Sequence, residues 1–251
     1  NITHPEAVRE VHRSYVEAGA DFITTNTFAI NPLKMSESRY TVSELVRAAI
    51  LNAQEARQEQ NYIVLDIGPS GKMLEPYGDL TVEEAYESFK EIIAIAKDDV
   101  DAILFETFMD LDEIKAGIKA AKDTCDLPVF ATMTFESRGR TLMGVDVETM
   151  VEQLEALGVD ALGVNCSLGP IELLSVVKEL SERSKLPILV QPNAGLPHVH
   201  PDGSLHYDIS PQAFADAVQP FIQLGVRLIG GCCGTDAETI RELKKREHPN
   251  G

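Results

Sequence analysis

The stretch Gly158-Val159-Asp160-Ala161-Leu162-Gly163-Val164-Asn165-Cys166-Ser167 contains a pattern that repeats through this chain. A glycine after a helix-like segment suits the position that ends a helix. The apolar run that follows suits a strand buried on both faces. Polar residues then come where the strand ends. The same order of helix, turn and apolar run recurs at 19–23, 99–103 and 225–229.

Seven apolar runs are predicted to be strands, with amphipathic helices between them. In the segment 82–97, apolar residues recur every three or four positions, as on one face of a helix. Strict alternation of strands and helices predicts an α/β fold with a parallel sheet, and a (β/α)8 TIM barrel fits best. A doubly wound sheet is the alternative, but no Gly-x-Gly-x-x-Gly follows a predicted strand. The predicted strands are 21–28, 62–68, 101–107, 128–135, 160–166, 187–192 and 227–232, and further predicted helices are 5–17, 110–122, 171–184 and 237–247.

The number of predicted strands is one short of a closed barrel. A length of 251 residues suits one domain of this fold, so 1–251 is predicted to be a single barrel domain. The chain opens with the helical pattern at 5–17, and we therefore expect the first strand to lie before Asn1, which would make the domain incomplete at its N-terminus. An open barrel would leave free strand edges beside 21–28 and 227–232.

The composition argues against several classes of partner. The formal net charge is −18 and the isoelectric point is about 4.7. Such an acidic surface repels the phosphates of nucleic acids and of anionic membranes. No apolar run approaches the roughly 18 residues that span a bilayer, and no signal-peptide pattern opens the chain. Four cysteines in a chain of this length do not suggest a disulfide scaffold, so a reducing cytoplasm is predicted.

Three of the four cysteines are predicted to form a metal site. Cys232 and Cys233 lie in Gly230-Gly231-Cys232-Cys233-Gly234-Thr235, directly after an apolar run. Successive side chains of a regular strand point to opposite faces, so both can reach one metal only where the backbone leaves strand geometry, which the glycines permit. Cys166 ends the strand two positions earlier in the barrel, and such strands contribute to the same interior layers. Three thiolates with an open fourth position are typical of catalytic zinc, although free cysteines are often simply small buried side chains.

Other polar residues also cluster at the predicted strand ends, where barrel enzymes carry their active sites. Some of them are plausible helix caps, namely Ser70, Thr107 and Ser167. Cys125 precedes a strand and is predicted to be structural, and His12 is predicted to be a packed core residue. His198, His200 and His206 lie in the irregular loop 193–210, a possible flap, and are predicted to be solvated. The polar residues at strand ends are Asn26, Ser70, Glu106, Thr107, Thr134, Glu136, Asn165, Gln191 and Asn193.

These motifs resemble those of the homocysteine S-methyltransferase family, along essentially the whole chain. The resemblance is closest to the branch formed by the homocysteine-binding barrels of cobalamin-dependent methionine synthases. Family members begin with a strand that ends in an Asp-Gly-(Ala/Gly)-x-Gly-Thr turn, and this chain has no such segment. The segments that carry the resemblance are 66–71, 106–108, 165–170, 191–195 and 230–235.

The resemblance implies roles for particular residues. It implies that Cys166, Cys232 and Cys233 hold Zn²⁺, with the homocysteine sulfur in the fourth position. Asn193 matches a residue that can occupy that position without substrate. The remaining candidates for binding substrate are Glu136 for the amino group, the glycine-rich turn with Gly68 and Ser70 for the carboxylate, and Glu106 and Asn165 at strand ends.

The implied reaction is S-methylation of homocysteine to methionine. The resemblance implies that the methyl donor is methylcobalamin on a separate module of the parent protein, which also carries a folate-binding module. Cobalamin is thus expected to be bound outside this domain. Two alternatives stay open. The donor could be S-methylmethionine or another small methyl compound, or the barrel could bind zinc or thiols without catalysis.

Overall fold

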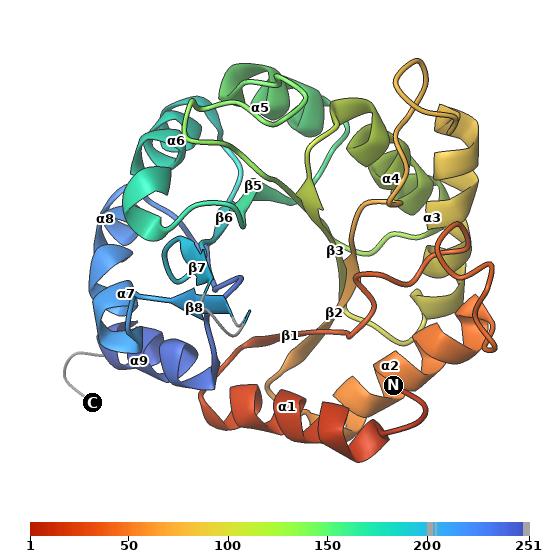
Figure 1. The fold of residues 1–251 in the computed structure, drawn as a ribbon, viewed down its shortest axis with the longest axis horizontal. Coiled ribbons are helices and arrows are strands. Elements are labelled where there is room, and N and C mark those ends of the chain that lie inside the picture. Colours follow the sequence, from red (N-terminus) through yellow and green to blue (C-terminus); the bar gives the residue numbers. More distant parts are fainter. Residues whose placement is uncertain (200–202, 204, 248–251) are drawn as a thin grey trace.

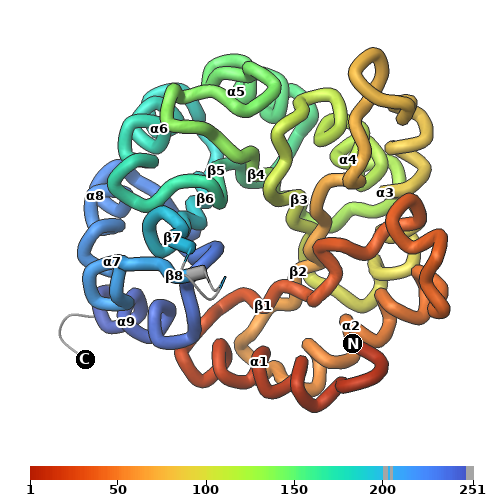
Figure 2. Tube along the Cα trace, viewed as in Figure 1, coloured from red at the N-terminus to blue at the C-terminus, as the bar shows by residue number. Residues whose placement is uncertain are grey.

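The protein is a ring of parallel strands surrounded by helices. The structure is a computed structural model, and it describes residues 1–199, 203 and 205–247. Followed from its N-terminus, the chain goes once round the ring (Figure 1, Figure 2). The described strands of the ring are β1 (Phe22–Thr24), β2 (Tyr62–Ile67), β3 (Ala102–Phe108), β4 (Val129–Met133), β5 (Ala161–Asn165), β6 (Ile188–Gln191) and β9 (Leu228–Ile229). The helices are α1 (Pro5–Glu17), α2 (Val42–Ala56), α3 (Val82–Ala96), α4 (Leu111–Thr124), α5 (Val147–Ala156), α6 (Pro170–Arg183), α7 (Pro211–Ala217), α8 (Gln219–Gln223) and α9 (Ala237–Glu247).

The prediction of an α/β barrel with parallel strands is confirmed. Each strand pairs in parallel with the next along the order β1-β2-β3-β4-β5-β6-β9. The predicted helices agree with α1, α3, α4, α6 and α9 to within two residues at each end, and the structure adds α2 and α5 to the alternation. None of the described helices is long and apolar enough to span a lipid bilayer.

The barrel is open on one side. Among the described strands, β1 and β9 each pair on one edge only, and they do not pair with each other. The helices still meet at this point, because α9 contacts α1, and Lys244 of α9 donates a hydrogen bond to Asp21 before β1 at 2.7 Å. The gap in the strand layer is lined by apolar side chains such as Phe22 and Leu228. It lies where an eighth strand would close the ring, and what fills it stays a prediction.

The barrel interior changes from apolar to polar toward the carboxyl ends of the strands. Side chains two positions apart on a strand point to the same face. On three strands a buried aliphatic residue is therefore followed, two positions later, by a polar side chain in the same interior. The pairs are Val64 and Asp66 on β2, Leu104 and Glu106 on β3, and Leu189 and Gln191 on β6. The polar side chains thus lie at the mouth of the barrel, above an apolar floor.

The helices begin at residues that suit a helix N-terminus, although the three plausible caps named from the sequence do not cap them. Thr81 begins α3 with a capping box, in which its hydroxyl and the Glu84 carboxylate satisfy each other's backbone N–H. Asp110 caps α4, and α6 begins after Gly169. The residues that do not cap these helices are Ser70, Thr107 and Ser167.

The strands on the open side are shorter than predicted. The predicted strand 21–28 becomes the three-residue β1, and 227–232 becomes the two-residue β9, because both stop pairing before the mouth. The predicted irregular loop 193–210 contains an antiparallel hairpin of β7 (Pro197–Val199) and β8 (Leu205–Tyr207). His200 lies outside the described residues.

Candidate metal centre and active site

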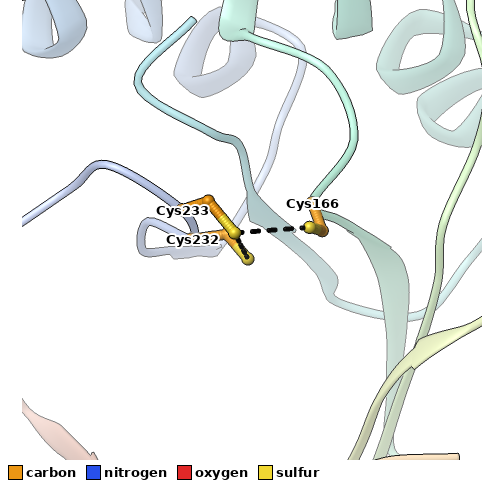
Figure 3. A group of neighbouring side chains, drawn as sticks. All are labelled: Cys166, Cys232 and Cys233. Atoms are coloured by element: carbon orange, nitrogen blue, oxygen red, sulfur yellow. Dashed lines mark hydrogen bonds between the residues drawn. The ribbon is translucent and has the colours of Figure 1, made fainter. Parts of the chain in front are cut away.

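The structure brings together three cysteines at the mouth of the barrel. Cys166 follows β5, and Cys232 and Cys233 lie in the turn after β9 (Figure 3). The Sγ atoms of Cys166 and Cys233 are 3.8 Å apart, and those of Cys232 and Cys233 are 3.9 Å apart. All three sulfur atoms lie within 4.8 Å of one another. Within the described residues this is the group of cysteine, histidine and acidic side chains able to hold a metal ion.

The spacing of these sulfurs fits a shared tetrahedral metal. Two thiolates bound to one zinc ion at about 2.3 Å are about 3.8 Å apart when the geometry is tetrahedral. The two measured separations of 3.8 and 3.9 Å match this value. Cys166 and Cys232 are half-buried and Cys233 is exposed, so one side of the cluster is accessible from the mouth of the barrel. Three ligands with an accessible fourth position suit a catalytic rather than a structural site.

The turn that carries Cys232 and Cys233 is held by the segment after β6. The Cys232 N–H donates to Pro192 O at 2.8 Å, and the Ala194 N–H donates to Cys233 O at 2.9 Å. The Cys233 N–H donates to the Asn193 side-chain oxygen at 3.1 Å. These bonds replace a regular strand pairing and let the two neighbouring cysteines point to the same place. Gly234 supports this path, since its φ of +80° favours glycine.

Cys166 is held differently, by an unusual backbone. Its φ is +63°, and that of Ser167 is +59°. The Cys166 N–H donates to Gln191 O at 2.9 Å, which continues the β5–β6 pairing past the end of β5. The left-handed conformation turns the chain sharply at the point where the strand ends. The side chain of Cys166 therefore points toward the other two cysteines (Figure 3).

The three thiols have different affinities for a proton. A hydrogen bond from the Cys232 thiol lowers the pKa of Cys166 to about 6. The same bond raises the pKa of Cys232, since its proton is shared with the Cys166 thiolate. Burial raises the pKa of Cys233, and the neighbouring charge of Cys166 adds to this. Cys166 is thus the most acidic of the three thiols.

Two carboxyl groups lie in the interior below the cysteines. Burial raises the pKa of Glu106 to about 7, and Glu106 is hydrogen-bonded to Asp66 and Gln191. Burial raises the pKa of Asp66 as well, and the charge of Glu106 adds to the effect. One oxygen of Asp66 and the side-chain oxygen of Gln191 have no hydrogen-bond partner within the described residues. A layer of polar side chains with unpaired acceptors therefore lies between the cysteines and the apolar floor of the barrel.

Comparison with known proteins decides the family. Residues 1–246 match the model of a family described as homocysteine S-methyltransferase. The chain belongs to the homocysteine S-methyltransferase family. The predicted resemblance and the prediction of a methyltransferase are both confirmed by this match.

Two relatives support the assignment over nearly the whole chain. Methionine synthase of Mycobacterium leprae (strain TN) is 31% identical over 97% of this chain. Methionine synthase of Mycobacterium tuberculosis (strain ATCC 25618 / H37Rv) is 32% identical over the same share. The chain spans only about a fifth of these relatives, 21% and 22% of their lengths. It corresponds to one part of a much longer polypeptide in those species.

Solved structures support the fold. The homocysteine methyltransferase MmuM from Escherichia coli, in its metallated form, superimposes with a TM-score of 0.83 and 23% identity, covering 98% of this chain and 86% of that one. Its apo form gives a TM-score of 0.78 at 25% identity, with coverage of 98% and 87%. The barrel of this homocysteine S-methyltransferase domain is thus shared with an enzyme that has been described both with and without metal.

Two of the predicted substrate residues lie beside the cysteines. Asn193 is buried and hydrogen-bonded to both sides of the cluster, to the Cys233 N–H and to the Cys166 sulfur. Glu136 is exposed at the mouth and accepts a hydrogen bond from the Ser167 hydroxyl at 3.3 Å. Glu106 lies in the interior below them.

The glycine-rich turn is clamped by protein groups. The Gly68 N–H donates to Phe28 O at 3.3 Å, and the Ser70 N–H donates to the Glu113 carboxylate at 2.8 Å. The Ser70 hydroxyl is fully buried and also donates to Glu113. On the other side, Lys34 donates to Pro69 O at 2.6 Å. Ser70 is therefore an anchor of the turn, and its side chain does not face the mouth.

Asn165 is also engaged within the protein. Its side chain is 1% exposed and is hydrogen-bonded to Thr107 and Thr132. Its side chain is thus not available for direct contact with a substrate, and any role in the site is through its neighbours.

Tyr207 and Asp66 are site residues that the sequence analysis did not select. Tyr207 of β8 is hydrogen-bonded to Cys233, and burial raises its pKa. The sequence gave no indication of this contact, because Tyr207 lies in a predicted irregular loop and only the β7–β8 hairpin brings it to the cysteines. Asp66 could have been found, since it follows the buried Val64 by two positions and so shares its interior face.

The residues excluded at the sequence level and described by the structure are not members of the group of three cysteines. Cys125 ends α4 and packs against the core of the barrel. His12 is buried on α1, and burial lowers its pKa. His198 is exposed and pairs with Asp208 at 3.1 Å.

Proposed function

We propose that this domain binds homocysteine and activates its thiol for S-methylation to methionine. The observation that carries the proposal is the set of three cysteine sulfurs within 4.8 Å of one another at the mouth of a homocysteine S-methyltransferase barrel. Cys166, Cys232 and Cys233 would hold Zn²⁺ there. When bound, zinc supplies a Lewis acid that lowers the pKa of a thiol in its fourth position.

The chain's own residues prepare this position. A free alkyl thiol has a pKa of about 8.5, so little thiolate is present at neutral pH. The exposed side of the cluster leaves room for the substrate sulfur. Asn193 touches both sides of the cluster and would yield when the substrate sulfur arrives. The proposal requires no general base, because bound zinc itself lowers the pKa of the substrate thiol.

The remaining groups would orient the amino acid. Glu136 at the mouth would attract the substrate ammonium, helped by its position beside Ser167. The clamped turn would present the Gly71 N–H to the carboxylate, since the amides of Gly68 and Ser70 are already used. Holding sulfur and methyl donor in line converts a bimolecular displacement into a positioned one, which is worth several orders of magnitude in rate.

The methyl donor is proposed to be methylcobalamin on another module. The two mycobacterial relatives are methionine synthases several times longer than this chain, so they have room for cobalamin- and folate-binding modules. Three reduced thiols require a reducing compartment, and we infer the cytoplasm.

The test is to measure zinc content and thiol binding together. The protein is purified under reducing, chelator-free conditions, and zinc is counted per chain. Homocysteine is then added, and free methylcobalamin, S-methylmethionine and no donor are compared for methionine formation. About one zinc per chain and methionine from methylcobalamin support the proposal. Methionine only from S-methylmethionine would reassign the donor. Zinc binding without any turnover by the intact parent protein would favour a non-catalytic barrel, and no zinc would refute the site.

A further inference from the structure

Three residues at the mouth share an uncommon backbone conformation. Among the described residues, the non-glycine positions with positive φ are Thr107 (67°), Cys166 (63°) and Ser167 (59°). This region is sterically unfavourable for side chains with a Cβ, and most of all for a β-branched residue such as Thr107. Such residues persist only where the surroundings hold them in place. All three lie at the ends of two strands, β3 and β5, next to the cysteine cluster.

One buried side chain connects these two strand ends. The Asn165 oxygen accepts the Thr107 N–H at 2.8 Å, and the Asn165 amide donates to the Thr107 hydroxyl at 2.7 Å. The same oxygen accepts the Thr132 hydroxyl of β4 at 2.8 Å. The Asn165 side chain is thus hydrogen-bonded to both the backbone and the hydroxyl of Thr107. It connects β3, β4 and β5.

These hydrogen bonds act on residues that lie next to the cysteine cluster. Thr107 follows Glu106, and the β3–β4 register shifts between Phe105 and Phe108, so β3 bulges at this point. Cys166 follows Asn165 directly. Thr134 adds a fourth bond, from its hydroxyl to the Asn165 carbonyl at 3.1 Å. The backbone just before Cys166 is therefore fixed from the side chain and from the main chain.

We propose that Asn165 is a positioning residue that holds Cys166 in its metal-binding orientation by keeping Thr107 in the left-handed conformation. The inference rests on the proposed zinc site. Asn suits this place because one planar group both accepts from an N–H and donates to a hydroxyl. An apolar residue of the same size can do neither. Without these bonds, Thr107 can relax toward the β region and the end of β5 is no longer held to β3 and β4, so the Cys166 sulfur can shift.

The test measures metal affinity and not turnover. Zinc Kd is determined by competition with a chromophoric chelator, and Co²⁺ is added separately to record the thiolate-to-cobalt absorption. Asn165→Ala is expected to weaken zinc binding about 10- to 100-fold, as is usual when a group supporting a metal ligand is removed. Asn52→Ala is the matched control, because Asn52 is equally buried at 1% exposure but lies on α2 and binds Arg9 and Asn1.

A rescue separates positioning from general stability. Thr107→Gly in the Asn165→Ala background is expected to recover at least part of the lost affinity, since glycine takes positive φ without steric cost. Should Asn165→Ala fail to fold, Thr132→Val removes one bond to Asn165 with little change of shape, and a loss of a few-fold is expected. The inference is overturned if these variants bind zinc as tightly as Asn52→Ala, or if glycine at position 107 restores nothing. If the unmodified protein binds no zinc, it is the proposed function that fails.

Discussion

The two halves of the cysteine cluster are built on opposite kinds of structure. Cys166 follows β5, a strand of five residues that pairs on both edges. Cys232 and Cys233 follow β9, which has two residues and pairs on one edge among the described strands. The first half is held by a buried side-chain network and the second by three hydrogen bonds to the segment after β6. A shared metal would therefore tie the open side of the barrel to its paired side.

Removing a ligand from either half is expected to have the largest effect. Cys232→Ser should weaken zinc binding by roughly a thousandfold or more, because a thiolate of the cluster is replaced by a weak hydroxyl donor. Cys125→Ser, at the far end of the barrel, should leave the affinity unchanged. Chelator competition on the purified proteins measures both. Equal affinities of the two variants would contradict the assignment of the site.

The two halves should also differ in reactivity when no metal is bound. Cys166 has its pKa lowered to about 6, and those of Cys232 and Cys233 are raised. A lowered pKa means that the thiolate is present above that pH, so alkylation of Cys166 should rise with a midpoint near pH 6. An ordinary thiol has its midpoint at about 8.5. Iodoacetamide labelling of metal-free protein from pH 5 to 9, located by mass spectrometry, gives the midpoint. Faster alkylation of Cys233 than of Cys166 would contradict this order of pKa values.

Metal binding should stabilise the open half more than the paired half. Zinc at a hundred times its Kd contributes about 2.7 kcal/mol to the free energy of unfolding of whatever unit it holds together. Hydrogen exchange with and without zinc is expected to show the larger gain in protection at 228–235 and the smaller gain at 161–166. Equal gains in protection in the two segments would mean that the edge strand β9 is already as stable as β5 without zinc.

Two glycines with similar backbones test the packing of the turn. Gly234 has φ +80°, and an added Cβ would lie 2.2 Å from the Tyr207 ring, whereas Gly225 has φ +89° and open space around it. Both substitutions to alanine should cost about 1–2 kcal/mol of stability for the backbone alone. Only Gly234→Ala should also weaken zinc binding, because Tyr207 and the turn must move apart. Thermal unfolding and zinc titration of the two variants give the comparison, and a parallel loss of affinity in Gly225→Ala would refute it.

The smallest effect is expected at the turn after β2, away from both halves. Ser70→Ala should lower stability by about 1 kcal/mol through the lost bond to Glu113. Zinc affinity should be unchanged. Homocysteine affinity, measured by titration of the zinc-loaded protein, should fall only slightly. A loss beyond tenfold would show that the hydroxyl contacts the substrate.

Much of the fold could be predicted because it follows local rules. Helix periodicity located α1, α3, α4, α6 and α9, since each buries one face against the sheet. Strand lengths on the open side were overestimated, because pairing depends on a neighbour that local sequence does not describe. The predicted caps were wrong at Ser70 and Thr107, where side chains are used by distant elements, α4 and β5.

The cysteine cluster, the barrel class and the acidic composition follow from residue order and type, since spacing along a strand sets which side chains share an end of the sheet. The contacts of Asn165, Tyr207 and the Asp66–Glu106 pair do not. Asn165 is hydrogen-bonded to β3 and β4, Tyr207 is brought in by a hairpin, and the two carboxyls meet on the neighbouring strands β2 and β3. Such pairings join residues that are far apart along the chain, so they exist only once the ring has formed and its interior excludes water.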